Sequence, residues 1–386
     1  MRDKTGIKEE YHSALDDVIR LCACAVNGEV PDSEWARELD PELLYKTAGH
    51  HLLTAIVGYS LEASGIHDHV FIQAKAKAIR KLGLMDSEMA VLFGKLEQKG
   101  IWYAPLKGTV LKDYYPAYGL RQMADHDILF DETCADEVKT IMQDMGFTSK
   151  HFGEGNHDCY YKEPVCNFEM HRSLFGNGHE TKMQEYYSDV KARLLPDKNS
   201  KYGYHFSPED FYIYMIAHEY KHYSASGTGL RSLLDTYAYL KKVTLDMDYV
   251  AVEMEKLGIR DFEELNRSLS FHIFGDSIAL EDLPENEAVM LSFVQKSGTY
   301  GTMENSIRNR MRKITGKQGK VTAGMKLKYY FKRLFPRQEQ LISWYPLAKY
   351  KIFIPLVWIF RFFRGLIVRR KRVIGEVKIV ERQKKI

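Results

Sequence analysis

The chain has 386 residues, of which 28% are charged, 45% hydrophobic and 12% aromatic. This length predicts two or three domains, and the composition excludes a fibrous or a disordered protein. The formal net charge of +3 conceals an asymmetry, because residues 306–386 carry 23 Lys or Arg and only 3 Asp or Glu. The tail therefore has a net charge of +20 and the first 305 residues −17, a division typical of contact with a membrane or a nucleic acid.

The cysteines and the apolar runs do not indicate an exported or membrane-spanning protein. The five cysteines are widely spread without a C-x-x-C pair, which argues against a disulfide framework and a cysteine zinc site. The first twenty residues are too polar for a signal peptide. The longest uncharged apolar run near the tail, residues 352–360, has nine residues, whereas a spanning helix needs about 18. We expect a cytoplasmic protein without a transmembrane segment.

The spacing of apolar residues predicts helices from residue 9 to about 98, and the pattern changes at residue 101. Short apolar and aromatic runs then alternate with a helical segment, which predicts an α/β block of roughly 75 residues. The elements expected in this block are strands over 101–106, 125–130, 159–162 and 165–171 and a helix over 133–145.

Helical patterns return after residue 207. Ser207 as N-cap, Pro208 at the first helical position and Asp210 at the third predict a helix over 208–223. Two further helices are expected over 228–242 and 247–257. Residues 316–324 are rich in Gly and Lys and predict a linker into the basic tail.

Three acidic residues on the predicted strands point to a metal site. Asp125 and Asp127 are two residues apart, so on a strand their carboxylates project from the same face. Glu169 lies between apolar neighbours on another predicted strand and supplies a third carboxylate. Oxygen ligands of this kind suit Mg²⁺, and two such ions about 4 Å apart activate a hydroxyl and stabilise a leaving pyrophosphate. We predict that these residues are catalytic and bind two Mg²⁺ ions.

Small and basic residues precede these carboxylates. Gly108 and Thr109 lie between a predicted strand and a predicted helix, where a glycine lets backbone N–H groups approach a phosphate closely. Lys107 and Arg121 add positive charge that suits the same phosphates, the arginine in a bidentate geometry. All four are predicted nucleotide-binding residues, although Lys107 and Arg121 could equally pair with the carboxylates.

With these motifs the chain resembles an uncharacterised bacterial nucleotidyltransferase family of the DNA polymerase beta superfamily. The resemblance rests on Leu106–Thr109, Gly119–Arg121, Asp125-x-Asp127 and Glu169-x-His171, and extends more loosely to residues 218–222 and 229–235. It implies that Gly108 and Thr109 match the Gly-Ser turn of the superfamily. It also implies that Asp125 and Asp127 match the D-x-D pair and that Glu169 is the third acidic residue.

Two residues depart from the superfamily pattern, since Thr109 stands where Ser is usual and Glu169 where Asp is more common. The resemblance implies a mixed α+β fold, with a small polymerase-beta-like nucleotidyltransferase sheet core embedded in a mainly helical protein. The expected domains are an N-terminal helical region (1–98), the α/β core (99–200), a helical domain (201–314) and a basic, aromatic-rich tail (315–386).

A second motif competes with this interpretation. His218, Glu219 and His222 form an H-E-x-x-H pattern on a predicted helix. In a metalloprotease such histidines bind zinc and the glutamate acts as base, so a zinc peptidase is an alternative function. The next histidine, His272, is far downstream and no conveniently placed third ligand follows. We favour a packing or substrate-side role for the pair.

The basic tail has a chemistry of its own. Residues 355–372 combine Trp and Phe with five arginines and a lysine, as an interfacial helix does at an anionic lipid surface. The segment 340–386 therefore either binds an anionic membrane or packs on the acidic part of the same protein. Nucleic-acid binding is the weakest option, because the aromatics are not interleaved as a stacking groove.

These observations predict an enzyme that uses Mg²⁺ to transfer a nucleoside monophosphate from an NTP to an acceptor hydroxyl or phosphate, releasing pyrophosphate. The sequence does not identify the acceptor. The alternative is a non-catalytic membrane-surface interaction protein on a degenerate nucleotidyltransferase fold. His171 shares the strand of Glu169, and we expect it to support the site without acting as acid or base. A lipid-binding tail would place the protein at the inner face of the membrane.

Overall fold

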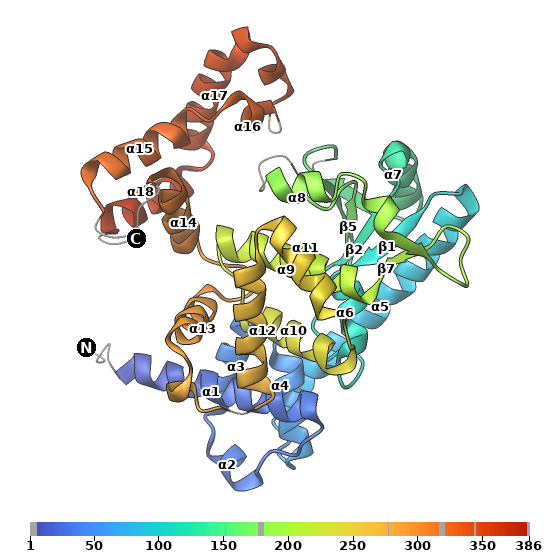
Figure 1. The fold of residues 1–386 in the computed structure, drawn as a ribbon, viewed down its shortest axis with the longest axis vertical. Helices are drawn as coiled ribbons and strands as arrows, with labels where there is room; N and C mark the ends of the chain where they lie inside the picture. Colours follow the sequence, from blue (N-terminus) through green and yellow to red (C-terminus); the bar gives the residue numbers. More distant parts are fainter. Residues whose placement is uncertain are drawn as a thin grey trace.

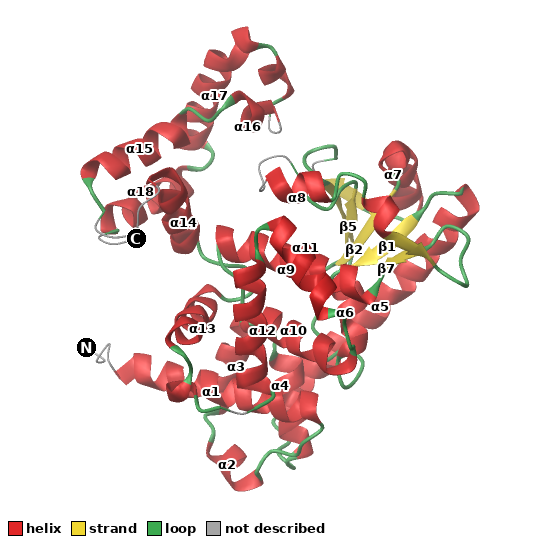
Figure 2. Ribbon diagram, viewed as in Figure 1, coloured by secondary structure: helices red, strands yellow, loops and turns green. Residues whose placement is uncertain are grey.

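The computed structural model of the chain describes residues 6–150, 152–176, 181–276, 278–315, 321–342 and 345–383. Figure 1 shows blue N-terminal helices, a sheet in cyan and green, and orange to red C-terminal helices that stand apart from the rest. Helices predominate and the strands gather in one place (Figure 2). The predicted α+β fold in a mainly helical protein is thereby confirmed.

The N-terminal helices begin and end at residues suited to those positions. Asp32, Asp40 and Asp68 are N-caps whose carboxylates accept hydrogen bonds from first-turn N–H groups. Gly100 ends the longest of these helices with φ 73°, a left-handed conformation that glycine adopts without strain. The helices are α1 (Gly6–Asn27), α2 (Ser33–Glu38), α3 (Pro41–His50), α4 (Thr54–Ala63) and α5 (His69–Lys99).

The main sheet is mixed. Its strands lie in the order β1 (Tyr103–Leu106), β2 (His126–Phe130), β5 (Cys166–His171), β4 (His157–Lys162) and β3 (Thr148–Lys150). Strands β2 and β5 run parallel, and the other neighbours pair antiparallel. The parallel register places Asp127 directly opposite Glu169.

The two faces of this sheet differ in chemistry. Ile128 and Met170 are fully buried in a core shared with α5 and α7 (Ala135–Asp144). Because successive strand residues point to opposite faces, Asp127 and Glu169 project from the other face. The apolar face anchors the sheet, which leaves the second face available for polar groups.

Helices that follow the sheet share a core with the N-terminal helices. Helix α12 contacts α1, and the shared hydrophobic core includes Leu15, Leu21, Leu234 and Leu269. The regions 1–98 and 201–314 therefore pack together. The elements of this part are α8 (Thr181–Tyr186), β6 (Leu194–Pro196), β7 (Tyr204–Phe206), α9 (Pro208–Ala225), α10 (Leu230–Lys242), α11 (Met247–Leu257), α12 (Arg260–Phe274) and α13 (Glu285–Ser297).

The C-terminal helices have small cores of their own. Helix α14 contacts α9, and α15 and α18 pack on α14 around Met311 and Tyr329. Leu341, Ala348 and Val357 form a separate cluster. Among the residues that the structure describes, no helix is long and apolar enough to cross a membrane. The helices are α14 (Met303–Thr315), α15 (Ala323–Leu334), α16 (Gln338–Ile342), α17 (Ile354–Ile367) and α18 (Arg370–Arg382).

Short helical segments complete the fold. They are α6 (Gly108–Leu111) and the 3₁₀ helices η1 (Lys112–Tyr114), η2 (Glu132–Cys134), η3 (Val190–Arg193), η4 (Leu280–Asp282), η5 (Pro346–Lys349) and η6 (Lys351–Phe353).

Most of the predicted elements are confirmed within a few residues. Helix α11 has the predicted bounds, and α9 continues two residues beyond the predicted end at 223. Strand β2 begins at His126, so Asp125 precedes the strand, and β4 begins two residues earlier than predicted. Residues 316–320 of the predicted linker lie outside the described residues, and α15 begins within its remainder at Ala323.

Candidate active site

The predicted carboxylates meet at the start of β2. Asp127 and Glu169 are register partners on neighbouring strands, and Asp125 is the residue just before β2. Burial and the charges of Asp127 and Glu169 raise the pKa of Asp125 to about 6. The structure thus gathers all three predicted catalytic residues in one electrostatic environment.

A histidine completes the closest group of potential metal ligands. Oxygen atoms of Asp127 and Glu169 and a ring nitrogen of His171 all lie within 4.8 Å of one another. His171 Nε2 is 2.8 Å from Asp127 Oδ1 and 3.6 Å from Glu169 Oε2. Two carboxylates and an imidazole form a donor set that fits a divalent cation. Asp125 is outside this group, and His171 takes the third place in it.

The ammonium of Lys107 lies in the middle of this group. Lys107 Nζ donates to Asp127 Oδ1 at 2.5 Å, and is 3.4 Å from His171 Nε2 and 3.8 Å from Glu169 Oε2. Burial alone would raise the pKa of Asp127, but the Lys107 charge and the His171 hydrogen bond hold it well below its usual range. Lys107 therefore pairs with the carboxylates, as one of the two sequence interpretations predicts.

The backbone at Lys107 adopts an uncommon conformation, with φ 46° and ψ −123° at the N-terminus of α6. A positive φ is rare for a residue with a side chain, and such conformations cost about 1–3 kcal/mol and cluster at functional sites. The turn directs Lys107 from the end of β1 toward the strand pair β2–β5.

Gly108 and Thr109 have packing roles in this arrangement. A Cβ atom at Gly108 would collide with the Arg121 guanidinium and would lie 2.9 Å from Met123 Sδ. The buried Thr109 hydroxyl accepts a hydrogen bond from the Asp127 backbone N–H at 3.2 Å. These contacts fix the start of β2, and nucleotide binding by the two residues stays a prediction.

Arg121 is committed to an ion pair with the helical region. Its Nε and Nη2 atoms donate to the two carboxylate oxygens of Asp235, both at 2.8 Å. The Tyr115 hydroxyl donates to Asp235 Oδ1, also at 2.8 Å. This bidentate pair ties the segment before β2 to α10. A direct contact of Arg121 with nucleotide phosphates stays a prediction.

Helix α9 contributes polar groups that the sequence analysis did not assign to the site. Burial and the Lys107 charge lower the pKa of Lys221 to about 8, while Glu169 and Asp127 oppose that shift. Burial and the charge of Lys107 also lower the pKa of His218. These charges influence each other because α9 lies near the polar face of the sheet. His218 and Lys221 are three residues apart on a predicted helix, and this spacing was the sequence signal that their side chains lie on the same side of it.

Helix α10 contributes a second cation. Burial and the Arg121 charge lower the pKa of Arg231, and Asp235 and Asp125 oppose this. Arg231 Nη1 donates to the Gln122 carbonyl oxygen at 2.9 Å. Arg231 therefore stands beside the same chain segment that leads into β2.

The H-E-x-x-H residues do not form a peptidase-type metal site. Glu219 is buried and accepts a hydrogen bond from Asn266 Nδ2 at 2.8 Å, and burial raises its pKa to about 7. His218 Nε2 lies 3.2 Å from His222 Nε2. Within the described ranges, neither group of three potential ligands contains His218 or His222. The substrate-side or packing interpretation fits this placement.

Residues 37–275 match a protein family described as uncharacterised nucleotidyltransferase. The chain belongs to this family. The matched region includes every predicted site residue, from Lys107 to Glu169, together with the helices that flank the sheet. No curated protein and no solved structure matches the chain. The predicted family is thereby confirmed, and the chain is an enzyme of the nucleotidyltransferase class.

Proposed function

We propose that this nucleotidyltransferase transfers a nucleoside monophosphate from an NTP to an acceptor and requires Mg²⁺. The observation that carries the proposal is the cluster of Asp127, Glu169 and His171 beside the Lys107 ammonium. Carboxylates on adjacent strands that follow a glycine-containing turn also agree with the polymerase beta superfamily pattern. Membership of that superfamily belongs to the proposal.

Asp127 and Glu169, with Asp125 nearby, would hold the metal. Two Mg²⁺ ions bound there would lower the pKa of an acceptor hydroxyl and offset the charge of the departing pyrophosphate. Basic side chains of the protein would position the nucleotide. Lys107 and Lys221 supply positive charge near the carboxylates, where a triphosphate would be attracted.

A cavity at the carboxyl ends of β2 and β5 suits the acceptor. Its volume is about 1060 Å³, and its lining includes Phe130 and Asp131 at the end of β2 and Arg172, the residue that follows His171 at the end of β5. Its wall combines aromatic and acidic side chains with the basic residues Arg172 and Lys191, an environment that favours a polar acceptor. The lining includes Trp102, Phe152, Phe175, Tyr187, Asp131, Glu132 and Asp189.

Nucleotide titration tests the proposed reaction. The Asp127→Asn and Glu169→Gln variants should each weaken Mg²⁺-dependent NTP binding about ten- to a hundredfold, because an interaction with a charged group contributes about 1.5–3 kcal/mol. Asp136→Asn is the matched control, since Asp136 is an exposed carboxylate on α7, against the opposite face of the sheet. Calorimetry with a non-hydrolysable NTP measures the affinities. Equal affinity in the wild type and both site variants would contradict the proposal.

The C-terminal helices favour a second element of the proposal, a location at an anionic membrane surface. Residues 306–386 carry a net charge of +20, and many large apolar side chains there remain exposed. Basic residues beside exposed apolar and aromatic groups are the features of an interfacial helix. The side chains at least half exposed on α17 and the segments next to it are Leu347, Tyr350, Ile352, Leu356, Ile359, Phe360, Phe363, Ile367 and Val368.

Packing on the acidic part of the protein was the alternative for this segment. Among the described residues, the substantial contacts of α17 are with α16, α18, η5 and η6, which all belong to the tail. A patch of this size rarely stays in contact with water, and the net positive charge favours an anionic bilayer over another apolar surface.

Vesicle co-sedimentation tests this location with the full chain. Binding to vesicles containing anionic phospholipid should exceed binding to neutral vesicles, and the double variant Leu356→Glu with Ile359→Glu should abolish the difference. Val289→Glu, at a 63% exposed apolar residue on α13, should bind like the wild type. Equal binding to both kinds of vesicle would overturn the proposed membrane location. Self-association of the wild type without vesicle binding would assign the apolar surface to a second copy.

A further inference from the structure

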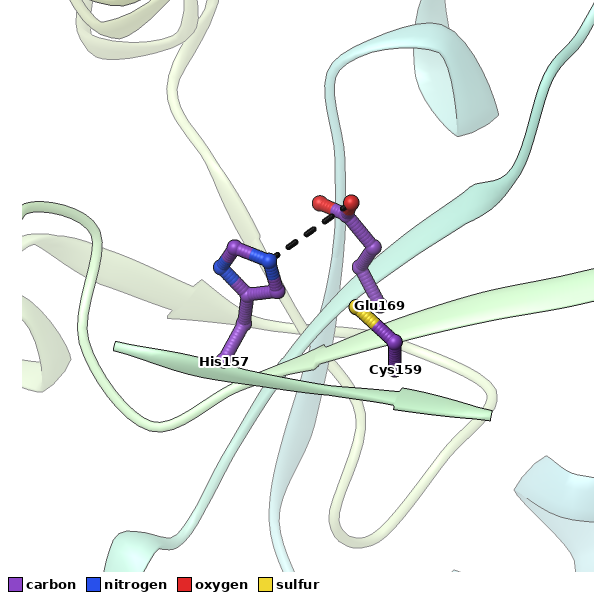
Figure 3. Close-up of side chains that lie close together, drawn as sticks. All are labelled: His157, Cys159 and Glu169. Carbon is purple, nitrogen blue, oxygen red and sulfur yellow. Dashed lines mark ion pairs between the residues drawn. The ribbon is translucent and has the colours of Figure 1, made fainter. Parts of the chain in front are cut away.

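A second group of potential ligands lies beside the proposed catalytic cluster. His157 and Cys159 are two residues apart on β4, so both side chains project from one face. Cys159 is the register partner of Glu169 on β5. Figure 3 shows the imidazole, the sulfur and the carboxylate close together, and one ligand atom of each lies within 4.8 Å of the others.

Glu169 belongs to both groups and uses its two oxygens differently. Its Oε1 atom lies 3.6 Å from His157 Nε2, whereas Oε2 lies 3.6 Å from His171 Nε2 and 3.8 Å from Lys107 Nζ. The Lys107 ammonium therefore faces the first group. The second group lies on the other side of the shared carboxylate.

The three donors of the second group differ in kind from the donors that Mg²⁺ takes. A thiolate, an imidazole and a carboxylate are the usual protein ligands of Zn²⁺, and three protein ligands leave a fourth tetrahedral position for water. Mg²⁺ prefers oxygen donors throughout. We propose that His157, Cys159 and Glu169 form a separate binding site for a Zn²⁺-class transition-metal ion.

The surroundings of the site permit such an ion to enter and to bind. All three side chains are partly exposed, and Cys159 is a free thiol. Cys159 would bind as the thiolate and release its proton to solvent. The Asp125 carboxylate acts on the Cys159 thiol and adds negative charge that attracts a cation, whereas the Lys107 and Lys221 ammonium groups act on His157 and oppose this attraction.

The shared carboxylate predicts a regulatory consequence, which rests on the proposed function. An ion held by His157 and Cys159 would draw Glu169 away from the Mg²⁺ site. We expect Zn²⁺ to inhibit nucleotidyl transfer in the wild type and to inhibit a Cys159→Ser variant much less. Ion binding itself does not depend on this consequence.

Cobalt substitution tests the site on the full chain without any nucleotide. Co²⁺ bound to a thiolate gives an intense sulfur-to-metal charge-transfer absorption, which we expect at one ion per chain in the wild type. Cys159→Ser should lose this absorption and weaken Co²⁺ binding by at least about tenfold, since even outer ligand partners contribute 10–100-fold to affinity. Cys134→Ser is the matched control and should retain the absorption, because Cys134, a free thiol in η2, packs against the apolar core on the opposite face of the sheet.

Two outcomes would overturn the proposal. One is Co²⁺ binding without a thiolate absorption in the wild type, and the other is an absorption that survives in Cys159→Ser. His157→Ala gives an independent test, since it should weaken binding while the thiolate absorption persists at high Co²⁺ concentration. Circular dichroism of each variant verifies its fold. If the wild type shows the cobalt absorption but does not bind nucleotide, the result would contradict the proposed transferase reaction and leave the metal site supported.

Discussion

The ion pair between Arg121 and Asp235 is expected to contribute strongly to stability. Their side chains are only 7% and 9% exposed, and both hydrogen bonds between them measure 2.8 Å. In an Asp235→Ala variant the guanidinium would stay buried and charged, because arginine does not lose its proton in proteins. The Tyr115 hydroxyl would also lose its acceptor.

The size of the effect follows from these contacts. Removing one partner of a buried ion pair costs about 3–5 kcal/mol, and an unsatisfied buried hydroxyl costs about 1–3 kcal/mol. We expect Asp235→Ala to lower the free energy of unfolding by at least about 3 kcal/mol, a large part of the 5–15 kcal/mol typical of a folded protein.

Urea denaturation monitored by circular dichroism measures this change. Glu137→Gln is the control, because Glu137 pairs with Lys99 at 3.2 Å in an exposed position and should cost less than about 1 kcal/mol. Replacing the pair by apolar residues, Arg121→Met with Asp235→Leu, should recover part of the loss. A loss below about 1 kcal/mol in Asp235→Ala would refute the reasoning.

Three further predictions concern residues around the site. Gly108→Ala should lower the free energy of unfolding by about 1–3 kcal/mol, since the new Cβ collides with Arg121. Gly94→Ala is the control: its Cβ would lie in open space on α5, and it should raise the melting temperature. The pKa of Glu219 is raised to about 7 from 4.5, so the folded state holds a proton that the unfolded state releases. The contribution of Glu219 to the free energy of unfolding is fully present below about pH 4.5 and is lost as pH rises to 7, by up to about 3 kcal/mol. Denaturation of Glu219→Gln measured between pH 4 and 8 should lack this decline. Because the pKa of Lys221 is lowered to about 8, NTP affinity should fall as pH rises through 8, and calorimetry should find this fall missing in Lys221→Met.

The carboxylates of the site were predictable because strand geometry is local. The two-residue spacing of Asp125 and Asp127 fixes which way their side chains point once the segment is extended, although β2 begins only at His126. The pairing of Asp127 with Glu169 depends on the register between two strands more than forty residues apart. The resemblance to the family indicated this pairing, which periodicity alone does not determine.

Contacts between distant segments were beyond prediction from the sequence. The pair of Arg121 with Asp235 and the approach of Lys221 to the sheet depend on how α9 and α10 pack, which local patterns do not specify. His157 was missed because the predicted strand began at Cys159, two residues after the observed start. Extending that strand by one period-two step would have placed both residues on the face of Glu169.

The position of Lys107 explains how two acidic side chains lie side by side on one face of the sheet. Asp127 and Glu169 face each other in register, and two carboxylates this close repel unless a cation lies between them. The Lys107 ammonium provides that cation, and the attraction offsets the strain of its positive φ. The same carboxylates would hold a divalent ion under the proposed function, and Lys107, no longer needed as their countercharge, would be available to the phosphates of a nucleotide. Under the proposed function, Lys107 thus stabilises the site without metal and binds substrate when the metal is present.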